Sequence, residues 1–382
     1  MISAGEPPER ARAVHQFVPA LIPRDATGSH TLLLRQVLRR AGWRSEIFAE
    51  ATHEELASES IPVTDYARRA GPDDVLVYQF STSSSVAELL CERSEPLIID
   101  YHNVTGPEHY EGWDDVTARR AAAAQEQLAM LSGRTALALA DSSYNEIGLR
   151  AAGYRQTAVV PVLVDLERLV AAPDPRVAAR LASAKSGGGA DWLFVGRLVP
   201  SKAQHELVKA LWAYRRLFDP HARLHLVGSA PSGRYLRALR SFIGDLGLNE
   251  AVRISGEVSD AALAAHFEAA DVYVSLSVHE GFGVPLLESM RVGLPIVALG
   301  EAAVADTVGS AGLVLDHAEP SRVAAAVHRV LSDPVLRARL TAAGIHRTDA
   351  LSMDRAAAAA VSAIATVAGD PPGRRAMVEV AG

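Results

Sequence analysis

The sequence has 382 residues but only one cysteine, Cys91. The chain can therefore form no internal disulfide and no cysteine-based metal cluster. Long apolar runs are also missing, since no stretch approaches the roughly 20 residues of a membrane-spanning helix. Residues 1–12 are polar and carry no apolar signal core. We expect a cytoplasmic protein without a membrane span, and we leave peripheral contact with a membrane open.

An excess of positive charge is absent as well. The formal net charge is −7, which disfavours a nucleic-acid partner. Arg35, Arg39, Arg40 and Arg44 can form a local basic patch, or they are simply a solvated helix face. Hydrophobic residues make up 49% and charged residues 22% of the chain, as in an ordinary globular protein. The length suggests two domains, each large enough for its own core.

Several catalytic signatures are missing. None of the His-Glu pairs that begin at His53, His205 and His279 is followed by the second histidine of a zinc protease. The sequence has no G-x-S-x-G elbow, no P-loop lysine motif, and no G-x-G-x-x-G after the first expected strand. An Asp-x-Asp pair is absent too, so we expect no metal held through such a pair on a nucleotide diphosphate.

Apolar runs of strand length alternate with helical segments through the whole chain. This alternation is typical of an α/β protein with doubly wound parallel sheets. The expected strands of the first half lie at residues 13–18, 45–48, 74–78, 96–100, 136–140 and 157–160. Those of the second half lie at residues 192–195, 224–227, 252–254, 272–276, 295–298 and 312–315.

The alternation stops between residues 161 and 190. That stretch ends in one serine and three glycines, which is typical of a flexible tract. We therefore predict a first Rossmann-like domain at residues 1–170, a linker at 171–190 and a second Rossmann-like domain at 191–353.

The most informative stretch runs from Val278 to Glu288. An apolar strand precedes it, and Pro285 is typical of the first position of a helix. The turn between strand and helix contains two glycines, so free backbone N–H groups and the helix dipole would face an anion there. Such a turn alone is equally consistent with a tight connection. Glu280 and Glu288 flank it, and because they would repel an anion we expect them to accept hydrogen bonds from hydroxyls.

A second strand and glycine turn carries two cations. Residues 196–202 read G-R-L-V-P-S-K. Arg197 can bind a diphosphate through two oxygens and Lys202 adds a point charge, or the two are a solvated surface pair. Because parallel strands bring their C-terminal ends to one edge, we expect this turn and the Glu280 turn to open into the same crevice.

Two residues of the first half are further candidates. Gly28 stands before a helix that we expect at residues 29–41, with Ser29 as its N-cap. Because Gly28 has no Cβ, a phosphate can approach the backbone there. His102 follows a strand at the expected ligand edge, where it can contact a sugar hydroxyl or a phosphate, or it is a structural histidine.

Two motifs together resemble a known family. The pattern G-R-L-x-x-x-K at residues 196–202, followed by E-G-F-G-x-P-x-x-E at residues 280–288, resembles the retaining glycosyltransferases of family 4. The match covers nearly all of the second half and is looser in the first, at Gly28, His102 and residues 141–143. The resemblance implies the GT-B fold, in which two Rossmann-like domains face each other across a cleft. It also implies that a last helix at residues 354–367 packs back on the first domain.

The resemblance implies roles at the nucleotide end of a donor. Arg197 and Lys202 would bind its diphosphate, with Gly28 approaching from the other domain. Glu288 would hold the ribose hydroxyls. The expected donor is a nucleotide-diphosphate sugar, a UDP-sugar as first choice and a GDP-sugar as second, and neither a cofactor nor a metal is expected.

Further roles follow at the sugar end. Glu280 and the amides of Phe282, Gly283 and Val284 would hold the transferred sugar, and His102 would line the reaction centre. The implied activity is retaining, metal-independent transfer to a hydroxyl of a glycan, a lipid-linked sugar or a small molecule. One alternative is a non-catalytic nucleotide-sugar-binding subunit, which would need neither Glu280 nor His102. The other is a nucleotide-sugar epimerase of the same fold, which the two-glutamate signature disfavours.

The sequence departs from the family pattern in three places. Ala302 and Ala303 replace a glycine pair, and Asp306 stands where a glutamate is common. Residues 162–165 read V-L-V-D where N-G-V-D is frequent, and the first loop has one glycine where many members have two. These departures leave the reaction class intact and bear on the donor sugar and the diphosphate geometry.

Overall fold

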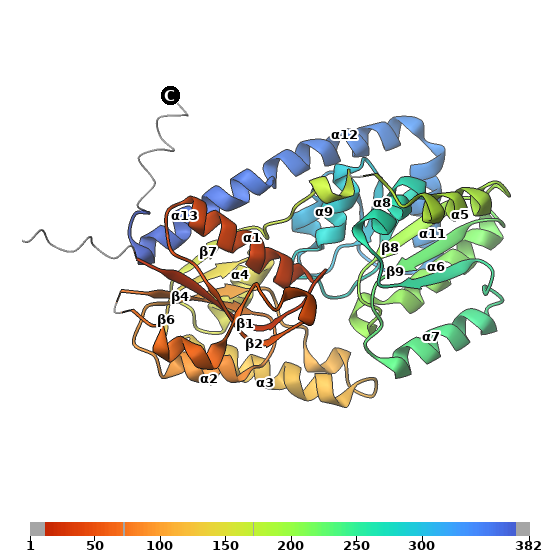
Figure 1. The fold of residues 1–382 in the computed structure, drawn as a ribbon. Helices are drawn as coiled ribbons and strands as arrows, with labels where there is room; N and C mark the ends of the chain where they lie inside the picture. Colours follow the sequence, from red (N-terminus) through yellow and green to blue (C-terminus); the bar gives the residue numbers. More distant parts are fainter. Residues whose placement is uncertain (1–11, 72, 171, 372–382) are drawn as a thin grey trace, which may run out of the picture. The chain divides into compact units, whose positions relative to one another are not determined.

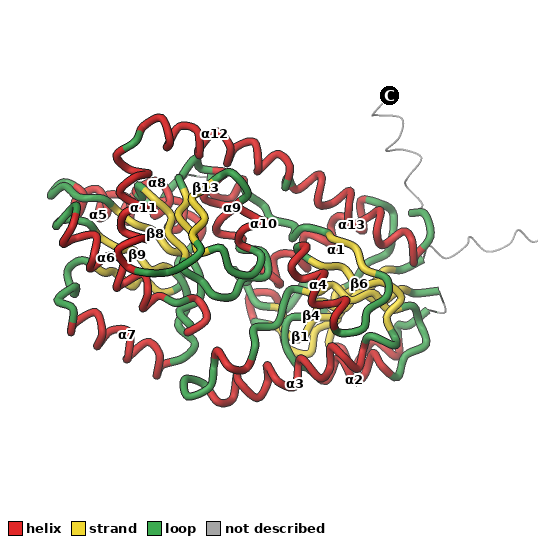
Figure 2. The backbone as a smooth tube through the Cα atoms, turned by 180° about the vertical axis from the view of Figure 1, so that it is seen from behind, coloured by secondary structure: helices red, strands yellow, loops and turns green. Residues whose placement is uncertain are grey.

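The computed structural model describes residues 12–71, 73–170 and 172–371 (Figure 1). They form two compact units. Unit 1 comprises the residues up to Val104, Ala123–Val164 and the segment from Met353 onward. Unit 2 comprises Thr105–Ala122 and Asp165–Ser352. Within each unit a parallel sheet is covered by helices, as Figure 2 shows from behind.

The sheet of unit 1 has the strand order β3-β2-β1-β4-β5-β6-β7, and all its neighbouring strands are parallel. Six strands occupy the predicted apolar runs, whereas the two-residue edge strand β3 was missed because it is too short for a pattern. The chain reverses its progress across the sheet between β1 and β4. The strands are β1 (Val14–Leu21), β2 (Ile47–Thr52), β3 (Ile61–Pro62), β4 (Val75–Phe80), β5 (Leu97–Tyr101), β6 (Thr135–Ala140) and β7 (Thr157–Val159).

Helices cover both faces of this sheet and enclose two main apolar clusters. Phe17, Tyr78 and Ile99 belong to one cluster, and Val14, Leu34 and Ile364 to the other. The helices are α1 (Ala26–Arg40), α2 (Ser85–Cys91), α4 (Ser143–Ala151) and α13 (Met353–Ala368), together with the part of α3 (Asp115–Leu131) that belongs to unit 1.

The sheet of unit 2 has the order β10-β9-β8-β11-β12-β13, again with parallel neighbours throughout. Here the chain reverses its progress between β8 and β11. The strands are β8 (Asp191–Val195), β9 (Arg223–Val227), β10 (Val252–Gly256), β11 (Val272–Ser275), β12 (Ile296–Leu299) and β13 (Gly312–Leu315). The prediction of two doubly wound parallel α/β units is therefore confirmed.

The helices of unit 2 pack their apolar faces on this sheet. Leu207 and Leu211 of one helix and Val323 and Val327 of another lie in the same core as Trp192 of β8. The helices are α5 (Pro175–Lys185), α6 (Gln204–Leu217), α7 (Gly233–Asp245), α8 (Asp260–Ala269), α9 (Val284–Arg291), α10 (Val304–Val308), α11 (Pro320–Ser332) and α12 (Pro334–Ala350).

The predicted linker at residues 171–190 contains a helix instead. Asp174 accepts hydrogen bonds from the first amides of α5, and α5 packs against α8. The glycines that follow are also held, because Arg223 donates to the carbonyl oxygens of Gly188 and Gly189. The units divide after Val104, Ala122, Val164 and Ser352, so the glycine tract marked a tight turn rather than a domain boundary.

Helix α13 has an alanine face that packs in unit 1. Ala356, Ala360, Ile364 and Ala368 recur every fourth residue and are all buried in the cluster that contains Leu34. By length and composition alone, the stretch Pro334–Ala368 could cross a membrane. The buried face of α13 accounts for part of that apolar composition, since 17% of the candidate window is buried.

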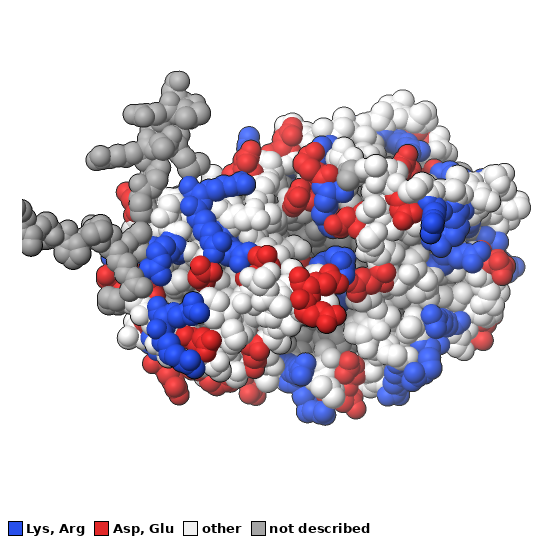
Figure 3. Space-filling model, in the orientation of Figure 1, with Lys and Arg blue, Asp and Glu red and all other residues white. Residues whose placement is uncertain are grey.

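Acidic and basic side chains are interspersed on the face drawn in Figure 3. Two arginines of α1 follow this pattern. Arg35 forms an ion pair with Glu59, and Arg39 lies 2.9 Å from Glu46. Their charges are therefore matched locally.

Candidate active site

Two loops meet at the point where the strand order of unit 2 reverses. One follows β8 and carries Arg197 and Lys202, and the other follows β11 and carries Glu280. Strands β8 and β11 are neighbours, and the amide of Val278 donates to the carbonyl of Ser201 at 2.9 Å. Ligands of open α/β sheets bind at such a reversal, outside the carboxyl ends of the strands. The topology thus singles out these loops as a candidate site.

Lys202 and Glu280 form an ion pair in this site. The distance from Lys202 Nζ to Glu280 Oε2 is 2.6 Å, and Nζ also donates to the carbonyl of His279 at 3.0 Å. The two side chains are only 17% and 16% exposed, so water screens the pair weakly. The residues assigned to a diphosphate and to a sugar therefore lie at one point, as the bonded phosphate and sugar of a donor require.

Arg197 carries a charge that other side chains leave unmatched. Its side chain is exposed, and no carboxylate of the described residues lies within ion-pair distance of it. Its backbone is fixed, because Gln204 donates to its carbonyl at 2.9 Å. An exposed guanidinium on an anchored backbone can bind two phosphate oxygens at once.

The start of α9 presents free amides. Gly283 caps this helix with φ of 82° and without a side-chain hydrogen bond. Within the described part of the chain, the amides of Phe282, Gly283 and Val284 donate to no acceptor. The loop is nevertheless fixed, since Thr307 Oγ1 donates to the carbonyl of Phe282 at 2.5 Å. Free amides and the positive end of a helix dipole favour an oxyanion or a hydroxyl oxygen.

Glu288 lies one turn into α9 and is not free. Its side chain is 2% exposed and forms an ion pair with Arg168 Nη2. Burial raises the pKa of Glu288, Arg168 lowers it, and Asp260 raises it further, with a net upward shift. Sequence reasoning missed Arg168, because its partner is 120 residues away and no local pattern connects the two.

His279 was considered in the sequence only as part of a protease motif, but it lies beside the ion pair. Burial lowers its pKa to about 4, and the charge of Lys202 and the ring of His109 contribute. Its ring centroid is 5.8 Å from that of His109. His279 is therefore a neutral imidazole at neutral pH, and it adds no charge to the site.

Gly28 occupies a different place from the predicted one. Helix α1 begins at Ala26 with Asp25 as its N-cap, so Gly28 lies in the first helical turn. Its amide already donates to Asp25 Oδ2 at 3.2 Å. A Cβ at Gly28 would lie 2.4 Å from the carbonyl oxygen of Ile22. The missing side chain is thus explained by packing within unit 1, and a phosphate contact stays a prediction.

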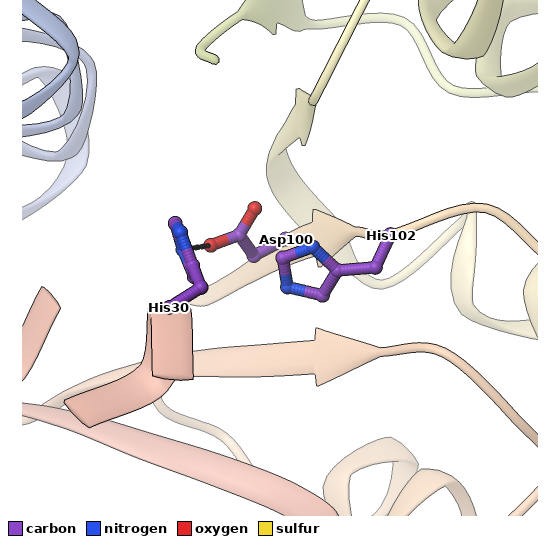
Figure 4. Close-up of side chains that lie close together, drawn as sticks. All are labelled: His30, Asp100 and His102. Atoms are coloured by element: carbon purple, nitrogen blue, oxygen red, sulfur yellow. Dashed lines mark hydrogen bonds and ion pairs between the residues drawn. The ribbon is translucent and has the colours of Figure 1, made fainter. Parts of the chain in front are cut away.

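His102 follows β5 at the carboxyl edge of the unit 1 sheet, as predicted, but both its ring nitrogens are engaged. Its neighbours His30 and Asp100 are shown in Figure 4. Nδ1 lies 3.2 Å from Asp141 Oδ2, and Nε2 lies 2.5 Å from Gln79 Oε1. A contact between His102 and a sugar hydroxyl therefore stays a prediction.

A chain of hydrogen bonds fixes the protons on His102. The carbonyl of Thr31 can only accept, so Gln16 must direct its Nε2 toward it, at 3.0 Å. Gln16 then directs its Oε1 to Gln79, whose Nε2 donates at 2.9 Å. The remaining atom of Gln79, Oε1, can only accept, and therefore Nε2 of His102 carries a hydrogen. Nδ1 faces the carboxylate of Asp141, so a second proton is held between them.

The surrounding charges agree with this assignment. Burial opposes a charge on His102, but Asp141 and Asp100 outweigh it and raise its pKa to about 9. Burial raises the pKa of Asp141, which shares the proton. At neutral pH, His102 is therefore an imidazolium rather than a general base.

His30, Asp100 and His102 lie close enough together to suggest a metal site. Their nearest ligand atoms are within 4.8 Å of one another. Hydrogen bonds account for the arrangement, however, because His30 Nε2 lies 2.9 Å from Asp100 and His30 Nδ1 accepts from the amide of Leu163. Since the nitrogens are already engaged, we assign no metal role to this cluster.

Comparison with known proteins places these observations in a family. The model of the family described as glycosyl transferases group 1 matches residues 179–347. A D-inositol 3-phosphate glycosyltransferase of Geodermatophilus obscurus is 32% identical over 312 residues, which cover 78% of this chain and 67% of the relative. A GDP-mannose-dependent alpha-(1-6)-phosphatidylinositol monomannoside mannosyltransferase of Mycolicibacterium smegmatis is 34% identical over 198 residues. That match covers 49% of this chain and 50% of the relative.

Solved structures show the same fold. Anabaena Alr3699/HepE, in complex with UDP and glucose, is similar with a TM-score of 0.76 and 20% identity, over 93% of this chain and 100% of that one. The sucrose-phosphate synthase of Thermosynechococcus elongatus is similar with a TM-score of 0.73 and 20% identity, over 91% and 97%. At these identities the likeness concerns the fold alone, and it confirms the predicted GT-B class.

Proposed function

Because the chain belongs to the glycosyl transferases group 1 family, we propose that it is a retaining, metal-independent glycosyltransferase of family 4. The predicted enzyme class, a glycosyltransferase, is confirmed by that membership. The proposed reaction moves a sugar from a nucleotide-diphosphate sugar to a hydroxyl of a glycan, a lipid-linked sugar or a small molecule.

The observation that carries the proposal is the Lys202–Glu280 pair at the strand-order reversal of unit 2. When the bond between sugar and phosphate breaks, negative charge grows on the departing diphosphate. The Lys202 ammonium, the Arg197 guanidinium and the first amides of α9 would stabilise that charge. Glu280, in contact with Lys202, would accept a hydrogen bond from a hydroxyl of the sugar.

The proposed donor is a UDP-sugar first and a GDP-sugar second. Support for UDP comes from the similar solved structure, which contains UDP. Support for GDP comes from the mannosyltransferase relative, whose name specifies GDP-mannose. Metal independence is proposed because the sequence has no Asp-x-Asp pair, whereas Arg197 and Lys202 supply positive charge.

A panel of nucleotide sugars in a thermal-shift assay identifies the donor. A ligand at 100 times its Kd adds about 2.7 kcal/mol to the free energy of unfolding. With that donor and an acceptor, proton NMR of the fresh product should show the anomeric configuration of the donor. An inverted linkage would contradict the proposal, and a donor that changes its own configuration without an acceptor would indicate the epimerase alternative.

A variant separates the enzyme from a non-catalytic binding subunit. Glu280→Ala should mainly lower kcat while the nucleotide still binds, because Glu280 is assigned to the sugar rather than to the diphosphate. Nucleotide affinity is measured by calorimetry beside the kinetics. Loss of nucleotide binding in Glu280→Ala would show that the sugar and phosphate ends are wrongly assigned.

A further inference from the structure

Arg168 connects three elements of unit 2. It lies in the short 3-10 turn Glu167–Leu169, which packs against α8. Its Nη2 forms an ion pair with Glu288 on α9, and its Nη1 lies 2.5 Å from Oδ1 of Asp260 at the start of α8. Among the residues that the structure describes, no other cation lies within ion-pair distance of Glu288.

The contact with Arg168 affects the protonation of Glu288, because Glu288 is buried. Its neighbours Leu287 and Ser289 are fully buried, and its own side chain is 2% exposed. A buried carboxylate without a counter-charge takes up a proton. A protonated Glu288 would present one O–H donor and could no longer accept hydrogen bonds at both oxygens.

The geometry of the pair leaves part of the carboxylate available. Arg168 contacts Oε1 of Glu288. No residue in the described part of the chain donates a hydrogen bond to Oε2. The ion pair therefore holds the charge and the orientation of the carboxylate while one oxygen stays open to a ligand.

We propose that Arg168 is a positioning residue for donor binding, which favours the charged form of Glu288 and orients its carboxylate to accept hydrogen bonds from the ribose hydroxyls. This rests on the proposed function, in which Glu288 binds the ribose. Arg168 acts through Glu288 and stabilises its charged form. Asp260 contributes by holding the other arm of the guanidinium, so the arginine is fixed from both sides.

The test compares ribonucleotides with 2′-deoxyribonucleotides. UDP, GDP and their 2′-deoxy forms are titrated into the full chain by calorimetry, and the ratio of the two Kd values measures ribose recognition. The wild type should prefer the ribose form by roughly 10-fold or more, as expected for a hydrogen bond to a charged group. At pH 6, Arg168→Met and Glu288→Gln should each bring the ratio close to one, and the double variant should lose little more.

The pH dependence of the ribose preference gives a second test, because a purely structural role of Arg168 would not make this preference depend on pH. In Arg168→Met, the ribose preference at pH 8 should be partly retained and should disappear at pH 6, because Glu288 takes up a proton. The wild type should lose less of its preference between pH 8 and pH 6 than Arg168→Met does. The other titratable groups that act on Glu288 or respond to it are Asp260 and Tyr273, and burial raises the pKa of Tyr273 far above this range.

The chain offers a matched control. Arg291 is also on α9 and pairs with Glu167 of the same turn at 2.9 Å, but both side chains are more exposed. Arg291→Met should leave the ribose preference unchanged. Arg168→Lys, which keeps a charge, should retain part of the preference, and Arg168→Gln should lose it as Arg168→Met does.

The possible outcomes distinguish an error in the role of Glu288 from an error in the role of Arg168. If Glu288→Gln keeps the ribose preference, the role of Glu288 in the proposed function is wrong, and that of Arg168 with it. If Glu288→Gln loses the preference but Arg168→Met keeps it at pH 6 and pH 8, only the role of Arg168 is overturned. Should Arg168→Met fail to fold, Arg168→Gln decides the same question.

Discussion

A single missing Cβ determines the packing of the first turn of α1. A side chain at Gly28 would meet the carbonyl oxygen of Ile22 at 2.4 Å, and a backbone atom cannot rotate away. A glycine-to-alanine change in a helix otherwise stabilises by up to about 1 kcal/mol. We expect Gly28→Ala instead to lower the free energy of unfolding by roughly 1–3 kcal/mol, because overpacking forces the backbone to shift. Urea unfolding followed by circular dichroism measures the change.

Gly148 is the control for that prediction. It lies within α4, is exposed, and a Cβ there would meet nothing within 4 Å. Gly148→Ala should leave stability unchanged or raise it by up to about 1 kcal/mol. Equal stability gains in both variants would mean that the contact with Ile22 does not constrain Gly28.

The proton on His102 is a second prediction at the residue scale. In nitrogen NMR of histidine-labelled protein at pH 7, His102 should give the signature of an imidazolium. His266 should give that of a neutral ring, because burial, His225 and Arg180 lower its pKa to about 4. Gln79→Leu removes the acceptor at Nε2 and should lower the pKa of His102. A neutral His102 at pH 7 in the wild type would contradict the hydrogen-bond chain.

The same shift predicts how stability varies with pH. Folding raises the pKa of His102 from the ordinary value of 6.5 to about 9. A raised pKa contributes stability that is fully present below pH 6.5 and is lost as the pH rises toward 9. The free energy of unfolding should therefore fall over that window, and less steeply in His102→Gln. Urea titrations at several pH values compare the two slopes.

At the scale of the element, α13 shows how an alanine-rich helix is held. Ala356 and Ala360 are 2% and 1% exposed, so there is no room for larger side chains on this face. Ala358 lies on the exposed face of the same helix. The burial of each alanine, rather than the alanine content of the helix, therefore determines whether a larger side chain can be accommodated there.

That difference gives a matched pair of substitutions. Ala360→Leu should lower the free energy of unfolding by about 1–3 kcal/mol, because three extra carbons enter a filled core. Ala358→Leu should change it by less than about 0.5 kcal/mol, as surface substitutions usually do. Chemical unfolding of both variants measures the difference, and an equal effect would mean that α13 does not pack on unit 1 as described.

At the scale of the whole molecule, the sequence predicts those features of the fold and of the site that depend on a local pattern of residues. Strand apolarity, a glycine between strand and helix, and the parallel order of the strands are enough to place Lys202 and Glu280 in adjoining loops. Contacts between distant residues carry no such pattern. Arg168 and Glu288 are 120 residues apart, and nothing near either residue indicates the pair.

Two features were assigned wrongly from the sequence for the same reason, namely that they depend on contacts with residues that no local pattern indicates. The glycines at 187–189 looked like a linker because glycine signals flexibility and tight turns equally. The carbonyls of Gly188 and Gly189 are in fact held by Arg223 at the start of β9. Gly28 looked like a phosphate contact because its nearest obstacle, the carbonyl of Ile22, belongs to a turn whose path the sequence does not define.

Charge balance across the whole site leads to the last prediction. Arg197, Lys202 and the amides at the start of α9 supply the positive groups that a departing diphosphate needs, so transfer should proceed equally with and without EDTA. Lys202→Ala should lower kcat/KM by roughly 10–100-fold, as the loss of a charge-assisted hydrogen bond implies. The control is Lys209→Ala, which removes a partly exposed lysine paired with Glu206 and should leave transfer unchanged. Activity that EDTA abolishes and Mg²⁺ or Mn²⁺ restores would mean that a metal, rather than Lys202, neutralises the leaving group.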